Sequence, residues 1–134
     1  MIYVVSRLER VLKGLCENGS FKLAIFSTSA GLVLASERAE DVDEKVVAAM
    51  GSLLSEAAYK AAEEIKLSTF QSMKIKYKDD FIICRNIIIS ESTQFILAIL
   101  ADIPESEDVE KYYDQLLDWA EENAEPELKK LAEI

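Results

Sequence analysis

The segment FILAILA, residues 95–101, decides the fold because it contains no polar side chain. A strand with one face in water alternates apolar and polar residues. A strand that is apolar on both faces is typical of the middle of a sheet, covered by helices on each side or by one helix layer and a partner. We expect this strand to end at Asp102, since Ile103 and Pro104 follow it.

Two more strands are predicted directly before this segment. Residues 72–78 alternate apolar side chains with three lysines, and residues 81–89 form a long apolar run that is interrupted by Arg85 and Asn86. Two consecutive aspartates separate these strands, and a polar stretch, residues 90–94, precedes the last one. Both separators are short and polar, as turns between neighbouring strands are.

A further pair of strands is predicted near the start of the chain. Residues 21–27 alternate between two apolar-rich faces, and residues 32–36 form a second short run. The turn TSAG, residues 28–31, lies between them. Because a parallel crossover needs a dozen residues or more, this pair is predicted to be an antiparallel hairpin.

Three helices complete the predicted order. Apolar residues recur at three- and four-residue steps over residues 2–16, 43–65 and 106–123, with Gly19 available for a left-handed cap after the first helix. We expect Pro126 to interrupt or restart the third helix. The order is helix, two strands, helix, three strands, helix (α-β-β-α-β-β-β-α), which predicts one domain, residues 1–134, of the α+β class.

The middle helix has an unusually wide apolar surface. Its main arc, which we expect to cover the chain's own core, consists of Val46, Met50, Leu53, Leu54, Ala57 and Ala61. A flank of small residues widens this arc: Val47, Gly51, Ala58 and Ala62. Together they exceed the stripe of about 100° that one packing partner needs. From the residues alone, the flank is either a dimer seam or part of a helix that lies flat on its own sheet.

The residue types exclude most catalytic chemistry. Histidine is absent, so no Ser-His-Asp triad, Cys-His pair or histidine metal site can form. The four glycines are not grouped into a phosphate-binding loop, and the acidic residues between 37 and 44 lack the spacing of a calcium loop. We therefore expect no enzyme activity, no cofactor and no metal. Cys16 and Cys84 lie in apolar patterns and are expected to be buried free thiols.

Charge limits the partners. The formal net charge is −10, which repels phosphate backbones and anionic lipid, so nucleic acid is not an expected partner. No apolar run is long enough to span a bilayer, and the first residues are too short an apolar run for a signal peptide. Together with two free thiols, this favours a reducing cytoplasm.

The order and several segments resemble the Roadblock (dynein light chain) family of the Roadblock/longin superfamily. The resemblance covers about residues 5–103, with residues 106–134 as a helical extension beyond it. Its turns differ, since the family usually has Asp-Gly in the first hairpin, where this chain has Ser29-Ala30-Gly31. The likeness lies in Leu8, Leu12 and Leu15 of the first helix, strands 21–27 and 31–36, the Ala-rich helix 48–62 and strand 95–101.

The resemblance implies a five-stranded antiparallel sheet, with helices on both faces, in a profilin-like layer whose last strand is central. It implies a homodimer, or a dimer with a related Roadblock subunit, in which the middle helices pack and the sheets join edge to edge. It also implies a regulator or scaffold for a small Ras-like GTPase, or an adaptor subunit of a motor or trafficking complex, without a catalytic site. The expected dimer interface is Val47, Gly51, Ala58, Ala62, Lys74, Ile75 and Lys76.

The sequence allows more than one role for the lysines of strand 72–78 and for Arg85. The lysines at 74, 76 and 78 either recognise an acidic partner, form a solvated face, or guard an edge strand against aggregation. Arg85, within an apolar strand, either pairs with an acid or reaches out from an exposed face. A small-molecule-sensing domain is a second functional hypothesis, with Arg85 as the one polar group that the sequence offers to a cavity between sheet and helix.

Overall fold

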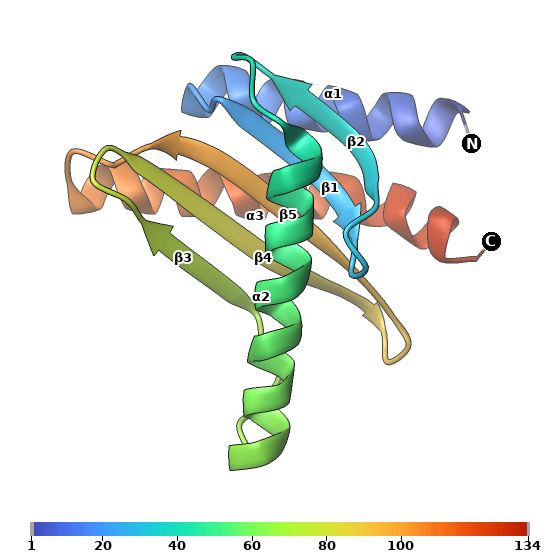
Figure 1. The fold of residues 1–134 in the computed structure, drawn as a ribbon. Coiled ribbons are helices and arrows are strands. Elements are labelled where there is room, and N and C mark those ends of the chain that lie inside the picture. The colour runs from blue at the N-terminus through green and yellow to red at the C-terminus, as the bar shows by residue number, and fades with distance from the viewer. Residues whose placement is uncertain (1, 134) are drawn as a thin grey trace.

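The computed structural model describes residues 2–133. It contains one five-stranded antiparallel sheet and three helices (Figure 1). The strands lie side by side in the order β2-β1-β5-β4-β3, so β5 is central, as the apolar segment predicted. The elements are α1 (Ile2–Gly19), β1 (Leu23–Thr28), β2 (Val33–Arg38), α2 (Glu44–Ile65), β3 (Ser72–Lys76), β4 (Asp80–Ser90), β5 (Thr93–Asp102) and α3 (Glu107–Ala132).

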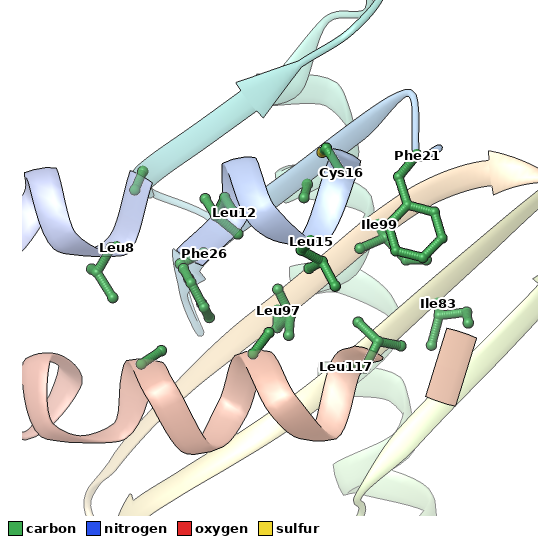
Figure 2. Packing of buried hydrophobic residues seen from close by; sticks show 14 of the residues in the cluster. Leu8, Leu12, Leu15, Cys16, Phe21, Phe26, Ile83, Leu97, Ile99 and Leu117 are labelled. Atoms are coloured by element: carbon green, nitrogen blue, oxygen red, sulfur yellow. The ribbon is translucent and has the colours of Figure 1, made fainter. Parts of the chain in front are cut away.

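Helices α1 and α3 cover one face of the sheet, and α2 crosses the other face (Figure 1). The larger core lies under α1 and α3. In Figure 2, Leu12 and Leu15 of α1 and Leu117 of α3 lie close to Leu97 and neighbouring side chains of the sheet, and these residues are almost fully buried. Helix α3 therefore belongs to the main core layer, although it follows the part of the chain covered by the family resemblance.

The smaller core lies between α2 and the other face of the sheet. Leu23 and Ile25 of β1, Cys84 of β4, and Ile96 and Ala98 of β5 contribute to it. Cys16 and Cys84 are free and buried, as expected. The sheet thus has buried side chains on both faces, which explains why β5 carries no polar residue between 95 and 101.

Two helix ends differ from the sequence-based expectation. Ser20, and not Gly19, adopts the left-handed conformation after α1, with φ of 54°. Gly19 is still needed, because a Cβ atom at that position would overlap the Phe21 ring. Helix α3 continues through Pro126 to Ala132 without a break. Pro126 is exposed, while Leu128 beyond it is fully buried, so tertiary packing outweighs the local cost of proline.

None of the helices within residues 2–133 combines the length and the apolar character that crossing a membrane requires.

Candidate protein-interaction surface

Helix α2 is a well-defined rod of 22 residues, about 33 Å long. Asp43 caps its first turn, where the carboxylate accepts hydrogen bonds from the backbone N–H groups of Lys45 and Val46 at 3.0 and 3.4 Å. Lys66 ends it in a left-handed conformation, and its N–H donates to the carbonyl of Ala62. This rod is long enough to extend past the sheet at its C-terminal end (Figure 1).

The sheet-facing side of α2 is made of small residues. The buried positions are Val47, Ala48, Gly51 and Ser55. A Cβ atom on Gly51 would lie 3.6 Å from Cys84 Sγ and 3.8 Å from Ile96 Cγ2, so this glycine faces the chain's own sheet. Small side chains let the helix lie close to the strands.

Val47 and Gly51 are thus buried against the chain's own sheet, and their place in a dimer seam stays a prediction. Ala58 and Ala62 lie half-buried further along the same side. A methyl group at Gly51 would meet Cys84 and Ile96 at ordinary contact distances, so the chain's own sheet does not require a glycine at this position.

The outward side of α2 carries the larger apolar residues, which we expected to face the core. Leu53 is 67% exposed and Val46 62% exposed. Single exposed apolar residues are ordinary, but a row of them along one helix marks an interaction surface. We call this row the α2 stripe; its exposed members are Val46, Leu53, Ala57 and Ala61, and the half-buried Met50 and Leu54 lie beside them.

Strand β3 lies beside this surface at the edge of the sheet. It pairs with β4 on one side only, and its other backbone edge is unpaired within residues 2–133. Met73 and Ile75 of β3 are half-buried and pack against the same small core as Met50 of the stripe. Apolar surface therefore runs from the α2 stripe towards the open edge, where the backbone can accept another strand.

The lysines of β3 lie on the opposite face of the strand. Lys74 Nζ donates to Glu110 Oε2 and Asp114 Oδ2 of α3, both at 2.9 Å. Burial lowers the pKa of Lys74, but these two hydrogen bonds outweigh it and raise the pKa above its usual value. Lys74 thus ties β3 to α3, whereas Lys76 is exposed at the edge.

Arg85 pairs with acids, which is one of the two roles that the sequence allowed. Its guanidinium donates to Asp118, to Glu121 Oε2 at 3.0 Å and to Asp114 Oδ1 at 3.3 Å, all on α3. Burial, together with the nearby charge of Asp118, raises the pKa of Glu121 in spite of its hydrogen bond to Arg85. Three carboxylates surround the guanidinium, so Arg85 fastens α3 to β4 and its charge is already paired where it borders a hollow of about 460 Å³ with Asp118 and Glu121.

Sequence reasoning missed a polar link at the end of α2. Asn86 of β4 is buried, and its side-chain amide donates to Tyr59 Oη at 2.7 Å and to the carbonyl of Phe70 at 3.1 Å. The rings of Tyr59 and Phe70 meet edge to face, with centroids 6.0 Å apart. The one signal for this link in the sequence is an asparagine inside an apolar strand.

Solved structures share this architecture. MglB from Myxococcus xanthus superposes with a TM-score of 0.79 at 15% identity, over 95% of this chain and 91% of that one. The gliding protein MglB from Thermus thermophilus gives 0.80 at 14% identity, over 95% and 92%. A Roadblock/LC7 domain from Streptomyces avermitilis gives 0.64 at 13% identity, over 92% and 93%. The chain has a Roadblock/longin-type fold.

This likeness confirms the resemblance noted from the sequence at the level of the fold. No family model and no curated protein matches the sequence. At 13–15% identity the structural likeness concerns the arrangement of helices and strands, and it leaves the partners of this chain open.

Proposed function

We propose that this chain is a non-enzymatic interaction module that pairs with a second copy of itself or with a related Roadblock subunit. The observation that carries the proposal is the exposed α2 stripe beside the open edge of β3. Two chains related by a two-fold axis near Leu53 and Leu54, the middle of α2, would lay their stripes against each other. The edges of β3 would then be free to join through Lys74, Ile75 and Lys76.

The dimer would serve a small Ras-like GTPase as a regulator or scaffold. The Roadblock/longin-type fold supports this role, since members of the Roadblock family act as platforms or regulators of small GTPases, and others act as adaptor subunits. The absence of histidine and of a phosphate-binding glycine loop in the sequence supports a role without chemistry of its own. The two free buried thiols suit the reducing cytoplasm that we expect for it.

Sedimentation equilibrium tests the pairing. The natural chain should sediment at twice its mass of 15.0 kDa at micromolar concentration. Leu53→Glu should give a folded monomer, because it places two carboxylates against each other across the two-fold axis. The matched control is Tyr112→Glu, which changes an exposed apolar residue on α3 and should leave the dimer intact. A natural chain that is monomeric, or a Leu53→Glu variant that stays dimeric, would contradict the proposal.

Nucleotide assays test the role towards a GTPase. The isolated chain should neither bind nor hydrolyse GTP in calorimetry and phosphate-release assays. Added to the Ras-like GTPases of its own organism, it should change the rate of hydrolysis or of nucleotide exchange of one of them. If it binds such a GTPase and alters neither rate, it is a scaffold; if it binds none, the GTPase part of the proposal is wrong.

A further inference from the structure

A groove runs along the flank of α2 that faces the turn between β4 and β5. It consists of two adjoining hollows of about 510 and 670 Å³, which share Tyr59, Glu63 and Gln94 in their walls. Tyr59 lies about 120° around the helix axis from Leu53, and Glu63 lies about 120° from Ala57. Tyr59 and Glu63 therefore lie on a different side of α2 from the stripe, whereas Lys60, seven residues after Leu53, borders both the groove and the stripe.

The two hollows together form a long groove. One end lies at Ser52, whose hydroxyl donates to the carbonyl of Ser29 in the β1–β2 turn at 2.7 Å. The other end lies at Leu67 and Phe70, after the helix has extended past the sheet (Figure 1). Residues 52 to 67 span about 22 Å at the helical rise. An extended chain of about six or seven residues covers that distance, so the shape suits an extended peptide better than a compact small molecule.

The walls combine apolar and acidic groups. Phe70, Leu67 and Ile88 line the first hollow together with Glu63 and Glu91, and no basic side chain lines it. In the second hollow, Lys60 lies 3.4 Å from Glu56 and so offsets that carboxylate. Glu63, which borders both hollows, makes no ion pair within the described part of the chain. The groove thus has an excess of negative charge beside aromatic and aliphatic surface.

Polar groups for a peptide backbone are also present. Tyr59 is held in place by the amide of Asn86, which donates to its oxygen. Gln94 borders both hollows. Ser55 borders the second one, and its hydroxyl is buried without a hydrogen-bond partner among residues 2–133.

We propose that this groove binds an extended peptide segment of a protein partner that carries one arginine or lysine among apolar residues. The cationic group would lie at Glu63, and its aliphatic stem would pack on the rings of Tyr59 and Phe70, where cation–π attraction adds to charge pairing. Neighbouring apolar side chains of the peptide would contact Leu67 and Ile88. The site is contained in one protomer and does not depend on the proposed dimer.

The test is a titration of the full-length, nitrogen-15-labelled chain followed by NMR. The probe is the hexapeptide acetyl-Leu-Val-Arg-Leu-Val-Ser-amide, and the comparison peptide has neutral citrulline in place of arginine. The arginine peptide should shift signals of residues 59–70 and 88–94 in a saturable way. The citrulline peptide should bind about five-fold or more weakly, since charge and cation–π pairing of an accessible group contribute about 1 kcal/mol.

Variants decide which residue binds the cation. Glu63→Gln should weaken binding of the arginine peptide about as much as the replacement of arginine by citrulline does. Glu17→Gln on the exposed side of α1 should leave the affinity unchanged. Leu53→Glu should bind the peptide unchanged, so a failure of the dimer and a failure of the groove are told apart. Equal binding of both peptides, shifts centred on the α2 stripe, or no saturation up to about 10 mM would each overturn the proposal.

Discussion

Gly51→Ala is expected to stabilise the protein. Gly51 lies inside α2, where glycine costs about 1 kcal/mol relative to alanine because it loses more backbone freedom on folding. Its position faces the sheet, and the added Cβ would meet Cys84 Sγ at 3.6 Å and Ile96 Cγ2 at 3.8 Å. Both are ordinary contact distances, so no atom has to move, and burial of the methyl group adds up to about 0.8 kcal/mol.

The sum is a gain of about 1 to 1.8 kcal/mol in the free energy of unfolding. For a chain of this length, that raises the melting temperature by roughly 3 to 8 °C. Urea unfolding followed by circular dichroism measures the change, at two protein concentrations because a dimer unfolds in a concentration-dependent way. The matched control is Gly19→Ala in α1, which should destabilise, since its Cβ would overlap the Phe21 ring.

Two results would refute this reasoning. If Gly51→Ala lowers stability, then the space between α2 and the sheet is smaller than the structure shows. If it leaves the protomer stable but separates the dimer, then Gly51 lies at a protomer interface, as its place in the small-residue flank first indicated.

Two further predictions concern ionisable groups. Burial raises the pKa of the Cys84 thiol to about 11. Burial, and to a smaller extent the negative charges of Glu37 and Glu17, raises the pKa of the Cys16 thiol to about 12. Both thiols should therefore react slowly with Ellman's reagent at pH 8 in the folded protein and fast in urea. Arg7 donates a hydrogen bond to Glu127 Oε1 at 3.0 Å and lowers the pKa of Glu127 below its ordinary value of 4.5. The ionised Glu127 therefore stabilises the folded protein above pH 4.5, and this stabilisation is lost as the pH falls through the pKa of the folded state. Arg7→Met should therefore lower the free energy of unfolding at pH 7 and make it less dependent on pH below 4.5, as measured by urea unfolding. Identical pH profiles of the variant and the natural protein would contradict this.

The sheet was predictable because its strands carry local signals. The unbroken apolar run of residues 95–101 placed β5 at the centre, and the short turn before Leu32 made the first pair of strands a hairpin. Both inferences rest on residues that are adjacent in the chain. Pro126 shows the limit of such signals, because its effect on α3 depended on burial of Leu128 against distant elements.

The orientation of α2 could not be predicted in the same way. The width of its apolar surface was visible, but apolarity alone does not tell which side meets the sheet. In the structure the small residues Ala48 and Gly51 face the sheet, and the larger Leu53 lies outside. The partners of Lys74 and Arg85 were equally hidden, since the α3 acids lie 29 to 40 residues away along the chain.

Crosslinking tests the pairing through the α2 stripe most directly. Leu53→Cys places an exposed thiol near the proposed two-fold axis, while the natural cysteines are buried. With a short bismaleimide at micromolar protein, this variant should form a covalent dimer rapidly, and the matched Tyr112→Cys variant on α3 should not. Equal crosslinking of the two variants, or crosslinking of Tyr112→Cys alone, would contradict a dimer built on the α2 stripe.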